Sequence, residues 1–170
     1  MTRSDRSTRS FFWLMIPIIA VVAMADQLVK HLMLNSLSVG EVRYIIGEWF
    51  RFRLLFNSGA AFSFGEGATW VFTFIQLAFV LAVLVLASKV RDHWSAVGLA
   101  LMAGGALGNV IDRLFRAPGF FVGHVVDFIS VGNFAVFNLA DAAITCGVVV
   151  FVIGMFIAER RGANKGETHA

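Results

Sequence analysis

Two aspartates, Asp127 and Asp141, lie fourteen positions apart in a stretch that is otherwise almost entirely apolar. A carboxylate is costly in such surroundings, so acids placed there mark functional sites. Two carboxyl groups held close together cannot both ionise easily, and they share a proton. The ionised member can then activate water while the protonated member polarises a carbonyl group. This is aspartyl peptidase chemistry, which needs no metal ion, no cofactor and no serine or cysteine nucleophile.

Helix capping, metal binding or a purely structural role could also account for the same residues. Asn138 and Asp141 have the spacing of a helix-capping box with Asn138 as the N-cap, and capping alone could explain both. His124 could join the aspartates as a zinc ligand, although one histidine is thin support for a metal site. If Asp127 and Asp141 are only a loop residue and a cap residue, the protein would be a non-enzymatic membrane scaffold.

The composition indicates a membrane protein. Of the 170 residues, 58% are hydrophobic and 15% are charged, whereas soluble domains have about 45–50% and about 25%. The apolar residues concentrate in four blocks, each long enough to cross a bilayer as a helix. We therefore expect an all-α membrane protein, a single integral membrane domain over residues 1–170. Its four transmembrane helices should span about 11–34, 68–88, 94–113 and 134–158.

The first apolar block could instead be a signal peptide. Three arginines precede 15 apolar residues, and Ala23-Met24-Ala25 fits a cleavage site. The apolar character resumes after Asp26, however, and the block as a whole is long enough to span. These features favour a retained helix.

Residues 41–66 are expected to form a small β-hairpin or cradle outside the membrane. Aromatic and aliphatic residues at 50, 52, 54 and 56 alternate with mostly polar neighbours, which is the period of a strand with one apolar face. Asn57-Ser58-Gly59-Ala60 has turn chemistry, and 61–64 could return as a second short strand. Residues 116–133 are expected to be a loop.

The basic residues predict the orientation of the chain. With four spans, both termini and the 88–93 turn lie on one side, which carries eight Lys and Arg residues against four to six on the opposite side. The positive-inside rule then places both termini in the cytoplasm. Because these residues cluster at the ends of apolar blocks, membrane topology explains them better than nucleic-acid binding does.

The acids of the spans share one depth. At about 1.5 Å per residue, Asp26, Asp112 and Asp141 all lie roughly 22–28 Å from the inner edge of the membrane. A shared layer near the outer face strengthens a functional interpretation. Acids in spans could also belong to a small proton-coupled transporter. A transporter would need acids at mid-depth or reachable from both sides, whereas the inner half of each expected span carries no acid.

Sequence neighbours separate these acids into two kinds. Asp26 has Lys30 at i+4. Asp112 is followed by Arg113 and has Arg116 at i+4, so both acids could form structural ion pairs. Asp127 has only His124 close by, and Asp141 has no cation within fifteen residues. Asp127 and Asp141, which lack such basic neighbours, are therefore the better candidates for catalysis.

Five motifs carry a family resemblance. They are Asp26-Gln27-x-x-Lys30, Asn57-Ser58-Gly59-Ala60-Ala61-Phe62-Ser63, Gly104-Gly105-Ala106-x-Gly108-Asn109-x-x-Asp112-Arg113, Gly123-His124-Val125-Val126-Asp127-Phe128 and Phe137-Asn138-x-Ala140-Asp141. Together they resemble the bacterial lipoprotein signal peptidases, the type II signal peptidases of prolipoprotein processing. The resemblance covers the chain except the second span and the tails. The segment 114–122 is longer than expected between the two family motifs that flank it.

The resemblance implies four transmembrane helices, a small periplasmic β-cradle, and Asp127 and Asp141 as the catalytic pair without a cofactor. It implies a diacylglyceryl-modified prolipoprotein as substrate, cut just before its lipidated cysteine at the periplasmic face of the bacterial inner membrane. Globomycin-type cyclic peptides are implied as inhibitors, and we expect a monomer embedded in membrane lipid. The residues implied to shape or line the site are Asp26, Lys30, Asn57, Gly59, Asn109, Asp112, Arg113, Asn138 and Ala140.

Overall fold

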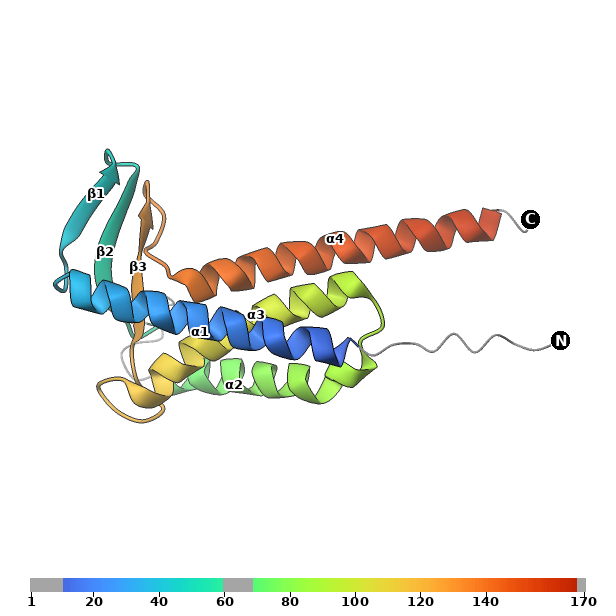
Figure 1. Ribbon diagram of the computed structural model, residues 1–170, viewed down its shortest axis with the longest axis horizontal. Helices are drawn as coiled ribbons and strands as arrows, with labels where there is room; N and C mark the ends of the chain where they lie inside the picture. Colours follow the sequence, from blue (N-terminus) through green and yellow to red (C-terminus); the bar gives the residue numbers. More distant parts are fainter. Residues whose placement is uncertain (1–10, 60–68, 168–170) are drawn as a thin grey trace.

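The structure is a computed structural model that describes residues 11–59 and 69–167. Four long helices run side by side, and a small sheet stands at one end of them (Figure 1). In chain order the elements are α1 (Phe12–Ser36), β1 (Val42–Ile46), β2 (Phe50–Asn57), α2 (Thr69–Leu86), the short 3-10 helix η2 (Ala87–Lys89), α3 (His93–Phe115), β3 (Val125–Val131) and α4 (Leu139–Glu167). Within the described residues, four helices are long and apolar enough to cross a membrane. The expected architecture of four apolar helices with a small β element is confirmed.

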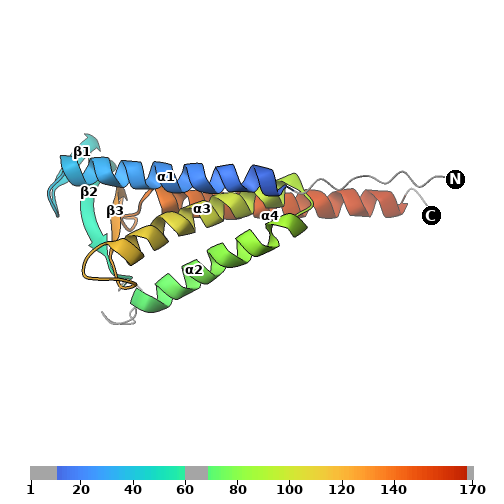
Figure 2. The ribbon, with the colours of Figure 1, turned by 60° about the horizontal axis from the view of Figure 1, so that its bottom comes forward.

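Helix α3 lies at the centre of the helices. It packs against α1, α2 and α4 (Figure 2) and is the most buried of the four spans. Its glycines make this possible, because a Cβ atom on Gly104 would meet Val22 Cβ of α1 at 2.7 Å. Gly98 of α3 likewise lies against the backbone of Gly147 in α4. The small residues of α3 therefore let two other helices approach its backbone closely.

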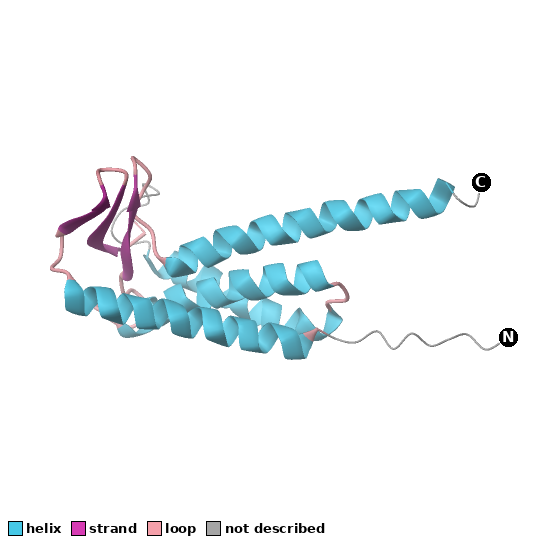
Figure 3. Cartoon of the chain, turned by 45° about the horizontal axis from the view of Figure 1, so that its top comes forward, coloured by secondary structure: helices cyan, strands magenta, loops and turns pink. Residues whose placement is uncertain are grey.

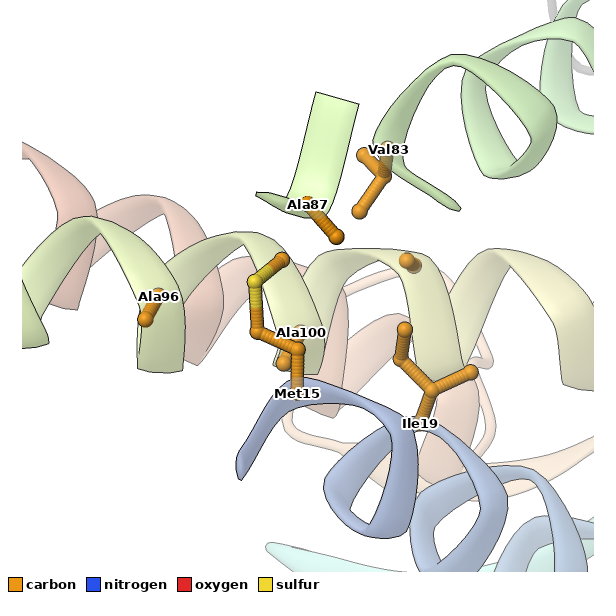
Figure 4. Packing of buried hydrophobic residues seen from close by; sticks show 7 residues of the cluster. Met15, Ile19, Val83, Ala87, Ala96 and Ala100 are labelled. Atoms are coloured by element: carbon orange, nitrogen blue, oxygen red, sulfur yellow. The ribbon is translucent and has the colours of Figure 1, made fainter. Parts of the chain in front are cut away.

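Apolar side chains fill the end of the helices that is farther from the sheet. Met15 and Ile19 of α1 extend across the small alanines of α3, toward Val83 and Ala87 (Figure 4). A second cluster lies under the sheet, where Leu37, just after α1, packs with residues of β2 and β3. The strand residues of that cluster are Leu54, Val126 and Phe128.

The sheet is antiparallel with strand order β1-β2-β3, and it stands across the end of the helices (Figure 3). The predicted strand at 50–56 is present as β2. Its alternation is interrupted by a register shift between Phe52 and Leu55, so Leu54 is buried while Phe56 is exposed. The predicted return strand at 61–64 lies outside the described residues.

The partner of β2 on its inner side is β3, which occupies part of the segment expected to be a loop. That expectation is wrong for 125–131. Residues Val125 to Phe128 are all buried, so this strand shows no alternation of apolar and polar residues. A strand buried on both faces cannot be recognised by period.

Two helix boundaries differ from the expected ones in ways that matter for the site. α4 begins at Leu139 rather than at 134, because Asn138 ends the preceding extended segment and Phe137 pairs with Ile129 of β3. α3 continues to Phe115, and the chain then returns through 116–124 to β3. The amide of Gly123 donates to the Arg113 carbonyl at 2.9 Å during this return.

Replacing Gly98 by Val should destabilise the protein, because its Cβ would meet the Gly147 carbonyl and the Phe151 backbone at 2.9 Å. Overpacking of this kind costs about 1–3 kcal/mol. The measurement is thermal unfolding in detergent. The matched control is Gly119→Ala, whose Cβ would have no heavy atom within 4 Å; equal melting temperatures for the two variants would contradict the packing argument.

Candidate active site

A cavity of about 350 Å³ opens where the helices meet the sheet. It brings together Asp127 of β3 and Asp141 of α4, the two acids singled out in the sequence. The cavity is lined by residues of β2, α2, α3, β3 and α4 and of the segment that follows β2: Asn57, Gly59, Phe72, Ile75, Gln76, Asn109, Arg113, Val125, Asp127 and Asp141.

Asp127 is nearly buried, with 2% of its surface exposed. One carboxylate oxygen accepts a hydrogen bond from Asn57 Nδ2 at 2.9 Å and the other accepts one from Asn138 Nδ2 at 2.7 Å. Burial raises the pKa of Asp127 to about 6. The hydrogen bonds from Asn57 and Asn138 lower this pKa, and the negative charge of Asp141 raises it. Asp127 can therefore carry a proton near neutral pH.

Asp141 is held in the first turn of α4 by the predicted capping box. The Asn138 amide donates to Asp141 Oδ2 at 3.2 Å, and the Asp141 amide donates to Asn138 Oδ1 at 2.9 Å. Asn109 Nδ2 of α3 donates to the other carboxylate oxygen at 2.9 Å. The capping interpretation is confirmed, and the capped carboxylate also lines the cavity.

Asn57 and Gly59 place a donor beside Asp127. The Gly59 amide donates to Asn57 Oδ1 at 2.8 Å, which leaves the Asn57 Nδ2 group facing Asp127. Gly59 has φ +89°, and a Cβ there would lie 2.8 Å from the Phe72 ring. Glycine adopts this positive φ without strain, and it has no Cβ atom to collide with the ring.

The ion pair expected between Asp26 and Lys30 is present, and it is part of a larger buried cluster. Lys30 Nζ lies 2.7 Å from Asp26 Oδ2 and 2.8 Å from Asp112 Oδ2, and all three side chains are fully buried. A third bond from Lys30 Nζ reaches Asn109 Oδ1 at 2.9 Å. None of the three charged residues lines the cavity, so they lie behind it.

This cluster attaches the elements that carry the two cavity aspartates. Asp26 Oδ1 accepts from the Ala140 amide at 2.9 Å, next to Asp141. Asp112 Oδ2 accepts from the Val126 amide at 3.2 Å, next to Asp127. Ala140 is itself fully buried, and its role is to supply this backbone donor.

Arg113 is placed differently from its sequence neighbourhood. Of the two basic sequence neighbours of Asp112, Arg116 forms the expected ion pair at i+4, and Lys30 of α1 is a second partner. No ion pair between Arg113 and Asp112 is present in the described part of the chain. Arg113 Nη1 donates to Gln76 Oε1 at 3.0 Å, and the side chain lines the cavity with both aspartates. Asp127 and Asp141 lack a cation nearby in the sequence, but in the folded protein Arg113 lines the same cavity. The expectation that no cation is close to them is therefore wrong.

The second span supplies cavity residues that the sequence analysis did not assign. Phe72, Ile75 and Gln76 of α2 all line the cavity. Gln76 is the only strongly polar side chain in that span, and a polar residue in an otherwise apolar span is the signal that could have indicated it.

The zinc alternative for His124 has no support from geometry. Within 11–59 and 69–160, there is no group of three His, Cys, Asp or Glu side chains that could hold a metal ion. The polar side chains that line the cavity supply two carboxyl groups, three amides and a guanidinium.

The family model for signal peptidase (SPase) II matches residues 18–157. The chain belongs to the signal peptidase II family. This family, A8, is one of aspartic peptidases, and the resemblance drawn from the five motifs is confirmed.

Similar proteins extend this result. The chain is 44% identical over 154 residues to a lipoprotein signal peptidase of Rhodococcus jostii, covering 90% of this chain and 78% of that protein. It is 50% identical over 127 residues to one of Streptomyces coelicolor, covering 75% of this chain and 62% of that protein. Its structure superposes on a bacterial membrane enzyme solved by the in meso method with a TM-score of 0.75, at 28% identity, covering 87% of this chain and 90% of that chain.

Replacing Asp112 by Asn should cost about 3–5 kcal/mol of stability, because Lys30 would lose one of two buried anionic partners. Unfolding in detergent, followed by heat or denaturant, measures the loss. The comparison variant is Glu41→Gln, which breaks the exposed Glu41–Arg43 pair and should leave the melting temperature nearly unchanged. If the two variants unfolded alike, Asp112 would not have the structural role assigned to it.

Proposed function

We propose that this protein removes the signal peptide from diacylglyceryl-modified prolipoproteins, cutting before the lipidated cysteine, with Asp127 and Asp141 as the catalytic pair. Family membership supports the reaction class, since the relatives are lipoprotein signal peptidases. The observation that carries the catalytic assignment is the shared cavity: two carboxyl groups from distant parts of the chain line it, each bound by amide donors.

The roles of the two acids follow from their surroundings. Asp141 lies in the first turn of α4, where the helix dipole favours a negative charge. Asp127 is buried and its pKa is raised to about 6, so it is the one that carries the proton. Asp141 removes a proton from water as the water oxygen attacks the scissile carbonyl carbon, and Asp127 gives its proton to the carbonyl oxygen. The C–N bond then breaks as the nitrogen takes the proton from Asp141, and Asp127 recovers its proton from the hydroxyl group.

Arg113 supports binding of the peptide. Its Nε is buried and has no hydrogen-bond partner in the described part of the chain. A buried donor of this kind needs an acceptor. A substrate carbonyl in the cavity would supply one, and the guanidinium charge would also favour the negative charge that develops on the reacting oxygen.

An apolar groove supports a lipid-carrying substrate. The groove has a volume of about 260 Å³, lies between α2, α3 and α4, and shares Ile75 and Gln76 with the cavity. Its remaining lining residues are Phe79, Met102, Ala106 and Ile144. An acyl chain attached next to the cleavage point could lie in this groove while the peptide bond reaches the aspartates.

The proposed orientation places both termini in the cytoplasm and the cavity near the periplasmic face. The beginning of α1 and the end of α4 lie at the end of the molecule opposite the sheet (Figure 1), which supports termini on one side. Eight basic residues on that side favour the cytoplasm.

Globomycin-type peptides would occupy the same cavity, and a monomer suffices because one chain supplies both aspartates.

Asp127→Asn and Asp141→Asn should each abolish cleavage while the protein still folds and inserts, because each replacement removes a proton-transfer group at nearly constant shape. Gel-shift assay of a lipidated prolipoprotein in detergent measures the loss. Asp92→Asn is the control: Asp92 caps α3 through the Ser95 amide, and asparagine caps as well as aspartate. Full activity in either cavity variant would remove that residue from the catalytic pair.

Asn57→Leu should move the alkaline limb of the kcat/KM profile to higher pH. Asp127 must hold a proton, so activity falls as pH rises through the apparent pKa of the pair. The hydrogen bond from Asn57 lowers the pKa of Asp127, and removing it raises that pKa further. A limb that stayed in place or moved to lower pH would contradict Asp127 as the protonated member, whatever the maximal rate.

A further inference from the structure

Three asparagine side chains surround the aspartates, and the orientation of each is determined by a group that can only donate. Asn57 Oδ1 accepts from the Gly59 amide, and Asn138 Oδ1 accepts from the Asp141 amide. Asn109 Oδ1 accepts from Lys30 Nζ at 2.9 Å. Because the oxygen of each amide is occupied in this way, its NH2 group must point the opposite way, toward a carboxylate.

Asn109 is the member whose orientation depends on a charged side chain. Lys30 Nζ has three donors and no acceptor, and its three partners are Asp26, Asp112 and Asn109. A second, longer bond to Asn109 Oδ1 comes from Asn138 Nδ2 at 3.1 Å. The bond from the ammonium is charge-assisted and therefore the stronger of the two.

We propose that Lys30 is a positioning residue for the reaction: it holds the Asn109 amide so that Asn109 Nδ2 donates to Asp141, which keeps Asp141 a hydrogen-bond acceptor, as a general base must be. This inference rests on the proposed function. It assigns a role in catalysis to a fully buried side chain that does not line the cavity. The chain of donors runs from α1 through α3 to α4.

The charges around Lys30 indicate that it acts through this hydrogen bond. Asp26 and Asp112 face it, and Arg116 Nε binds Asp112 at 2.6 Å. Two acids and two cations leave the cluster without net charge, so its field at a distance is weak. The charged groups that line the cavity with Asp141 are Arg113 of α3 and Asp127 of β3, and the Lys30 replacements leave both in place.

A double-mutant cycle with Lys30→Met, which removes every donor at this position, and Asn109→Leu tests this coupling. Each single variant should lower kcat at least about tenfold, a part of the roughly 10²–10⁴-fold that acid–base catalysis contributes, with KM nearly unchanged. The double variant should be no slower than Asn109→Leu alone, because both changes break one chain of donors. Additive losses or an effect confined to KM would overturn the proposal.

Asn109→Asp keeps the test decisive if Lys30→Met does not fold. The aspartate still accepts from Lys30 but cannot donate to Asp141 when ionised. We expect a loss of kcat at neutral pH and partial recovery in acid, as the new carboxyl group takes up a proton. A wild-type kcat for Asn109→Asp at neutral pH would overturn the proposal.

Arg116→Gln is the matched control. It removes the second cation bound to Asp112, and that arginine has no hydrogen bond to any of the three asparagines among the described residues. It should change stability but leave kcat nearly unchanged. A kcat loss equal to that of Lys30→Met would show that the charge cluster, and not Asn109, carries the effect. A different result would contradict the proposed function itself: full activity of Asp127→Asn or Asp141→Asn.

Discussion

The contact on which the rest of the structure depends is the buried ammonium of Lys30 between Asp26 and Asp112. Burying three charges costs several kcal/mol for each ion unless every partner is present. Here the second oxygens of the two acids also bind, one to the Ala140 amide and one to Arg116 and Gln27. The cluster is thus satisfied only when α1, α3 and α4 are all in place.

This constraint explains why the glycines of α3 lie where they do. A Cβ on Gly108 would fall within 2.5 Å of Asp26 Oδ2, and one on Gly105 would overlap the Ala140 carbonyl. Close approach of α1 and α4 to the backbone of α3 is what brings Asp26 to the first turn of α4. The same glycines of α3 therefore allow the helices to pack closely and allow the buried ion pairs to form. The two aspartates of the cavity lie on β3 and α4, and both elements are attached to this cluster.

Much of the fold and of the site could be predicted from the sequence. The four apolar blocks and the strand at 50–56 follow from composition and period. The capping box at Asn138 and the ion pair at Asp26 were also predicted, because both depend on spacing along one helix. β3 was missed because a strand buried on both faces has no alternating pattern.

The sequence by itself therefore determined the class of the protein, its spans and the residue types available for chemistry, since these depend on local spacing and hydropathy. Only the tertiary structure decided which side chains meet. In the fold, Arg113 lies in the cavity beside Gln76 and not on its sequence neighbour Asp112. Lys30 is linked to Asp141 through Asn109. Such contacts join residues of different helices, and neighbour counts along one helix cannot reveal them, because the distance between helices is set by packing.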